Sequence, residues 1–126
     1  MSARIAAIVL GVVFVLIGLL GFFQPLVLGL FQVNTAHNLV HIISGLVLLG
    51  GAFSSLGSGM ALKIIGVVYV IVAIAGFLPF LYGGDGTMLL GFIQMNDADK
   101  WLHVVLAIVI LGAGFALPDD DRAMAM

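Results

Sequence analysis

Long apolar runs alternate along this chain with short segments rich in glycine, proline and polar residues. A helix needs about 20 apolar residues to cross the hydrocarbon core of a bilayer. Four runs reach about that length, at about residues 5–23, 35–53, 61–82 and 98–117. The pattern therefore predicts four membrane-spanning helices joined by short loops.

Composition strengthens this interpretation. Hydrophobic residues make up 63% of the 126 residues and charged residues only 8%, whereas a soluble domain is usually about 25% charged. We therefore expect an integral membrane protein in contact with lipid. The net charge of −2 gives no support for a nucleic-acid partner. The absence of cysteine excludes disulfides and thiolate metal sites.

The second half of the chain repeats the first. The segment GLFQVNTAHNLVHIISGLVLLGGAF (29–53) aligns without gaps with GFIQMNDADKWLHVVLAIVILGAGF (91–115), at a shift of 62 residues. The preceding runs also match, because GVVFVLIGLLGF (11–22) aligns with GVVYVIVAIAGF (66–77). These matches predict two tandem helical hairpins.

We place repeat one at about residues 4–56 and repeat two at about 59–117, followed by a cytoplasmic tail at 118–126. Each repeat crosses the membrane twice, so both copies enter from the same side and are related by an axis along the membrane normal. The expected fold is an all-α bundle of four transmembrane helices with pseudo-twofold symmetry, forming a single domain. Spans two and four are then equivalent partners.

Basic residues predict the orientation. Arg4, Lys63 and Arg122 fall on one side of the predicted membrane, and Lys100 falls on the other. Because basic residues concentrate in cytoplasmic loops, we expect both termini to be cytoplasmic, in a bacterial inner membrane. The loops before spans two and four would then face outward.

Polar residues mark the start of both even-numbered spans. Asn34 and Asn96 occupy equivalent positions, and asparagine is a preferred N-cap residue. Asp99 stands three residues after Asn96, as the acid of a capping box does, and it also suits the positive end of the helix dipole. In the first repeat His37 takes the place of Asp99. The two asparagines and Asp99 therefore have a sufficient structural explanation.

His41 and His103 lie seven residues beyond these caps, roughly 10 Å along each helix at about 1.5 Å per residue. Residues four apart share a helix face, which pairs His37 with His41 and Asp99 with His103. If the pseudo-twofold axis runs between spans two and four, three imidazoles and one carboxylate converge. Ionisable groups inside a membrane are costly, so this convergence needs an explanation.

Four interpretations are open. His37, His41, Asp99 and His103 could bind a divalent metal, while His41 and His103 alone could ligate haem iron or a chlorophyll-type or bacteriochlorophyll-type pigment. A histidine–aspartate relay could carry protons or sense pH. The simplest interpretation is structural: the histidines bond to each other, to Ser44 or Asn38, or to a backbone carbonyl, and tie two helices together.

The pattern NxxHNLVHxxxG, followed later by NxADxWLHxxL, resembles the bacterial membrane family named domain of unknown function 4383. The resemblance covers about residues 4 to 117. It implies a four-span membrane protein, and it implies no activity. By this likeness the signature positions are Asn34, His37, Asn38, His41, Asp99, Trp101 and His103.

Taken together, the sequence favours a small non-enzymatic membrane protein that serves as a structural or accessory subunit, associated with other membrane subunits or with copies of itself. The first alternative is a protein that binds a metal, haem or pigment through its histidines. A small transporter or channel is less favoured, because residues 42–53 and 104–117 offer an ion almost nothing polar except Ser44.

Overall fold

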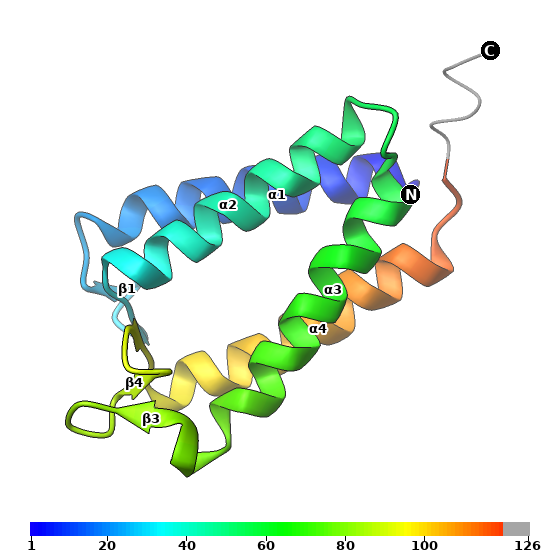
Figure 1. Cartoon of the computed structure of the whole chain (residues 1–126). Coiled ribbons are helices and arrows are strands. Elements are labelled where there is room, and N and C mark those ends of the chain that lie inside the picture. The colour runs from blue at the N-terminus through cyan, green and yellow to red at the C-terminus, as the bar shows by residue number, and fades with distance from the viewer. Residues whose placement is uncertain (120–126) are drawn as a thin grey trace.

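The computed structural model describes residues 1–119 and is mostly helical (Figure 1). The four helices are α1 (Ala3–Gly21), α2 (Thr35–Ala52), α3 (Ser58–Gly76) and α4 (Asp97–Ala116). Each is long and apolar enough to cross a membrane, so the prediction of four long apolar helices is confirmed within the described residues. Of the tail expected at 118–126, residues 120–126 lie outside the described part of the chain.

The predicted boundaries of the third span were wrong at both ends. The helix begins at Ser58, directly after Gly57 with its φ of +89°, and it ends at Gly76 instead of near residue 82. The early end follows from Pro79, which lacks an N–H donor and disfavours helical geometry at the residue before it. Leu78 is accordingly extended, and a single 3₁₀ turn, η1 (Pro79–Leu81), follows.

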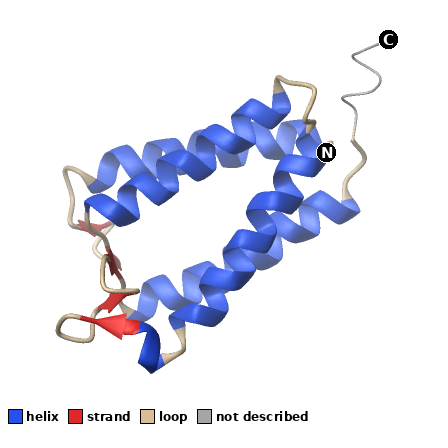
Figure 2. Cartoon of the chain, in the orientation of Figure 1, coloured by secondary structure: helices blue, strands red, loops and turns tan. Residues whose placement is uncertain are grey.

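Short antiparallel strands, which the hydrophobic pattern did not indicate, form the loops before α2 and α4 (Figure 2). The strands are β1 (Leu26–Val27) with β2 (Phe31–Gln32), and β3 (Tyr82–Gly83), β4 (Met88–Leu89) and β5 (Ile93–Gln94) in that order. The β1–β2 and β4–β5 hairpins occupy positions that match at the shift of 62 residues. Their turns also match, since Leu28 and Leu90 have φ angles of +55° and +56°. Positive φ is rare for leucine, so both loops adopt the same unusual turn.

Each helix packs most extensively on the partner within its own hairpin, α1 on α2 and α3 on α4. Glycine permits this close approach: a Cβ atom added at Gly45 would lie 2.6 Å from the Gly11 carbonyl oxygen, and one added at Gly66 would lie 2.8 Å from the Leu111 backbone. Small residues let membrane helices approach in this way. α2 and α4, the spans predicted to be equivalent partners, do not pack along one another.

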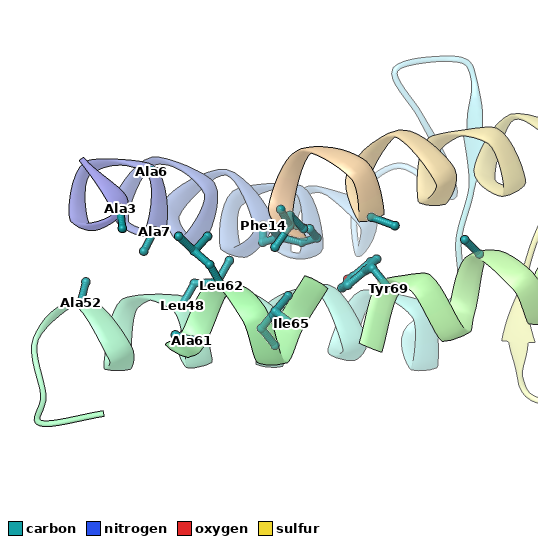
Figure 3. Packing of buried hydrophobic residues seen from close by; sticks show 13 residues of the cluster. Ala3, Ala6, Ala7, Phe14, Leu48, Ala52, Ala61, Leu62, Ile65 and Tyr69 are labelled. Carbon is teal, nitrogen blue, oxygen red and sulfur yellow. The ribbon is translucent and has the colours of Figure 1, made fainter. Parts of the chain in front are cut away.

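The apolar core changes character along the bundle (Figure 3). Alanines fill it near the start of α1, the end of α2 and the start of α3, as Ala3, Ala7 and Ala52 illustrate. Larger side chains, Phe14 and Tyr69, fill it further along. Beyond them the interior becomes polar and contains His37, Asn38, His41, Ser44, Asp99 and His103, all buried.

Candidate metal centre

The first turns of α2 and α4 are held by asparagine caps. The Asn34 Oδ1 atom accepts a hydrogen bond from the His37 amide at 3.0 Å, and the Asn96 Oδ1 atom accepts one from the Asp99 amide at 2.9 Å. In α4 the Asp99 Oδ2 atom also accepts from the Asn96 amide at 2.9 Å, which completes a capping box. These bonds satisfy amides that have no partner within the helix.

The same asparagines also join the two loops. Asn34 Nδ2 donates to the Phe92 carbonyl at 2.9 Å, and Asn96 Nδ2 donates to the Leu30 carbonyl at 2.8 Å. Leu30 and Phe92 are equivalent positions of the two halves, so each half makes the same bond to the other. This reciprocal pair holds the N-termini of α2 and α4 close to each other.

Three histidines meet behind this connection. The ring centroids of His37 and His41 are 4.6 Å apart, and that of His103 lies 5.6 Å from His37 and 6.5 Å from His41. One potential ligand atom from each ring lies within 4.8 Å of the other two. The side chains are 1%, 4% and 3% exposed. Of the four side chains predicted to converge, the three histidines therefore lie together.

His37 has a defined tautomer. Its Nδ1 atom lies 2.7 Å from the Gln94 carbonyl oxygen, and since a carbonyl only accepts, Nδ1 must carry the proton. The Nε2 atom therefore presents a lone pair, and it is buried without a hydrogen-bond partner. A backbone carbonyl that fixes the tautomer in this way is typical of histidines that ligate metals. The sequence gives no sign of this role for Gln94, because its contribution comes from the backbone.

The other two rings lack partners as well. Both ring nitrogens of His41 and the Nδ1 atom of His103 are buried with no hydrogen bond. No hydrogen bond joins either ring to Ser44, Asn38 or another described residue, so His41 and His103 do not tie the helices together by hydrogen bonds. Each unsatisfied buried polar group costs about 1–3 kcal/mol. A cluster of such atoms at one point needs an explanation, such as ordered water or a bound ion.

An aromatic layer closes the cluster toward the apolar core. The Phe14 ring lies 5.8 Å from His41, and the Tyr69 ring lies 5.8 Å from His103 and 5.3 Å from Phe14. Ser44 donates to the Val40 carbonyl at 2.7 Å, so the Tyr69 hydroxyl, 3.1 Å from Ser44 Oγ, donates to the serine. Both hydroxyls are thereby occupied and neither contacts a histidine ring through a hydrogen bond.

Asp99 takes a different place from the histidines. It is fully buried, its Oδ2 atom is used in the capping box, and its Oδ1 atom has no hydrogen-bond partner. The cluster of mutually close ligand atoms among the described residues consists of the three histidines and does not include Asp99. Asp99 therefore lies one helical turn before His103 on α4, but its carboxylate serves as a helix cap.

Comparison with known proteins identifies the family. A family model described as a domain of unknown function (DUF4383) matches residues 4–116. No curated protein and no solved structure matches the chain. The family match includes all three histidines, both asparagine caps and all four helices, and it confirms the resemblance noted in the sequence. The chain therefore belongs to the DUF4383 family of domains of unknown function.

Proposed function

We propose that this protein is a multi-pass membrane protein that binds one transition-metal ion through His37, His41 and His103. The observation that carries the proposal is the convergence of three buried imidazoles, with ligand atoms within 4.8 Å of one another and ring nitrogens that have no other partner. Metal coordination would use these lone pairs and remove the penalty of leaving them unsatisfied.

The ligand set favours particular ions. Three imidazoles without a thiolate suit zinc or copper better than calcium or magnesium, which prefer oxygen ligands. Zn–N bonds of about 2.0–2.1 Å place the nitrogens of a tetrahedral site roughly 3.4 Å apart. The rings therefore need only small rotations to close on an ion. Three protein ligands also leave a fourth position open, as in catalytic zinc sites.

A single ion is favoured over a haem or a pigment. His41 and His103 were predicted to hold a macrocycle between them, but the His37 ring lies 4.6 Å from one and 5.6 Å from the other. That ring occupies space that a planar macrocycle would need.

The proposal includes a membrane arrangement. The two hairpins are tandem repeats related by a pseudo-twofold axis along the membrane normal, supported by the matched β-hairpins and the reciprocal bonds of Asn34 and Asn96. Arg4 and Lys63 on one side against Lys100 on the other support cytoplasmic termini in a bacterial inner membrane. Arg122, which the orientation argument also used, lies outside the described residues. The metal centre would then lie in the outer half of the membrane.

The test is metal binding by protein purified in mild detergent and stripped with a chelator. We expect one zinc or copper ion per chain, measured by elemental analysis and by competition with a chromophoric chelator. His41→Ala and His103→Ala should each weaken binding by roughly 100-fold or more, beyond the 10–100-fold seen when an outer-shell partner is lost.

Ser44→Ala is the matched control, since it removes a buried polar atom from the same region of α2 without removing a ligand. It should retain the affinity of the original protein. Absence of a stoichiometric ion, or equal affinity in all four proteins, would refute the proposal. Association with other membrane subunits and the lack of enzymatic activity stay predictions.

A further inference from the structure

An apolar cavity of about 190 Å³ lies beside the histidine cluster, between α1 and α4 and beneath the β1–β2 hairpin. Its walls include Val13 and Phe14 of α1, Phe31 of β2 and Leu106 of α4. His41 is the one polar side chain in the wall. The cavity therefore offers an apolar space with a single polar contact point.

The cavity lies at the junction where two helices make the slighter contact. A loop of five residues, 53–57, ties α2 directly to α3, and these two helices pack against each other. No connection joins α1 to α4, and their contact is much slighter. The cavity lies at this junction, and Val13 in its wall is 48% exposed on the apolar outer surface of the bundle. In a membrane-spanning bundle this exposed apolar surface would face lipid, so the cavity is within reach of lipid-soluble molecules.

The chemistry of His41 defines the guest. A neutral imidazole has one nitrogen with a lone pair and one N–H group. In a metal centre the lone pair binds the ion, and the N–H group of a ligating histidine almost always donates to an oxygen. For His37 that oxygen is the Gln94 carbonyl. For His41 the described residues supply none, and its side chain is only 4% exposed. A molecule in the cavity that His41 lines could supply this oxygen.

Size and polarity restrict this molecule further. An apolar cavity of ~150 Å³ in a protein interior is sufficient to bind benzene, so about 190 Å³ accommodates one substituted ring. The absence of a charged side chain in the wall disfavours an ionised guest, because burying an unpaired charge is very costly. The guest is therefore neutral, lipid-soluble and equipped with an acceptor oxygen.

We propose that the α1–α4 cavity binds a neutral one-ring phenol or quinone from the lipid phase, with its oxygen accepting a hydrogen bond from His41. The inference builds on the proposed metal centre, because His41 belongs to both sites. It deepens that function by naming the class of molecule that reaches the centre.

The experiment uses 4-fluorophenol as the probe and fluorobenzene as the same ring without oxygen, observed by fluorine NMR with the protein in lipid nanodiscs. We expect saturable binding of 4-fluorophenol and about tenfold weaker binding of fluorobenzene, the size of effect that one hydrogen bond gives. Val13→Phe fills the cavity and should abolish saturable binding. Val12→Phe is the matched control, since Val12 is the neighbouring residue, is 43% exposed and lies outside the cavity wall.

Zinc binding is measured on the same samples, so the two proposals can fail separately. Saturable phenol binding that Val13→Phe abolishes and Val12→Phe preserves supports the cavity, even if no ion binds and the metal proposal falls. Zinc binding without saturable phenol binding overturns the cavity alone. Equal phenol signals in the original protein and both variants would also overturn it, because partition into the bilayer would then explain them.

Discussion

Replacing Gly45 by alanine tests the shortest distance that an added glycine Cβ would have to the backbone of another segment, among the described residues. The added Cβ atom would lie 2.6 Å from the Gly11 carbonyl oxygen and 2.9 Å from the Val15 backbone nitrogen, both on α1. Backbone atoms cannot rotate away as a side chain can, so α1 and α2 would have to separate by several tenths of an ångström. Helix association in membranes depends on such packing. We therefore expect Gly45→Ala to destabilise the protein.

The magnitude follows from two opposing terms. Inserting a methyl group into a well-packed contact typically costs about 1–3 kcal/mol. Alanine is favoured over glycine inside a helix by about 1 kcal/mol, so the net loss at Gly45 is about 0–2 kcal/mol. Gly50 lies on the same helix with no atom within 4 Å of an added Cβ. Gly50→Ala should therefore keep or slightly raise stability, and the two variants should differ by about 2 kcal/mol, roughly 30-fold in the unfolding equilibrium.

The assay is reversible unfolding by sodium dodecyl sulfate in mixed micelles. Trp101 is the single tryptophan of the chain. Its ring lies 5.2 Å from that of Phe77, so its emission reports the separation of α3 from α4, and circular dichroism follows helix content in parallel. Equal midpoints for the two variants would refute the argument, because they would mean that Gly45 has as much free space as Gly50. A more stable Gly45→Ala protein would refute it equally.

Two further predictions concern the loops. Asn34→Ala removes both the cap and the bond to the Phe92 carbonyl and should lower the free energy of unfolding by about 1–2 kcal/mol. Asn34→Asp keeps an oxygen that can cap the helix, so it should lose less stability in the same unfolding assay. Equal losses of stability in the two variants would contradict this prediction. Burial raises the pKa of Tyr82, whose hydroxyl donates to the Gly76 carbonyl at 2.7 Å. The neutral phenol therefore stabilises the fold at lower pH, and this contribution is lost as pH rises through the ordinary tyrosine pKa toward the raised one. In the Tyr69→Phe protein Tyr82 is the only tyrosine, so phenolate absorbance reports its titration alone. The absorbance should rise at a pH above the ordinary tyrosine pKa. A rise at the ordinary pKa would contradict the prediction.

Several features of this protein were encoded locally and could be derived from the sequence. The four spans follow from the length of apolar chain that a bilayer requires. The caps Asn34 and Asn96 follow from side-chain chemistry next to the first helical turn. The duplication also indicated that His41 and His103 occupy equivalent depths. Each of these conclusions depends on neighbouring residues or on internal repetition, and none of them requires knowledge of the fold.

Tertiary structure decided the features that depend on contacts distant in sequence. The end of α3 was misjudged because residues 77–82 remain apolar although Pro79 stops the helix. Helix pairing within each hairpin follows from close glycine contacts, which composition alone does not locate. The Gln94 carbonyl that orients His37 is a backbone atom of another segment and has no signature in the sequence. The cavity beside His41 lies where α1 and α4 meet, and their contact is slighter than that between α2 and α3, so nearly equivalent sequences acquire different surroundings.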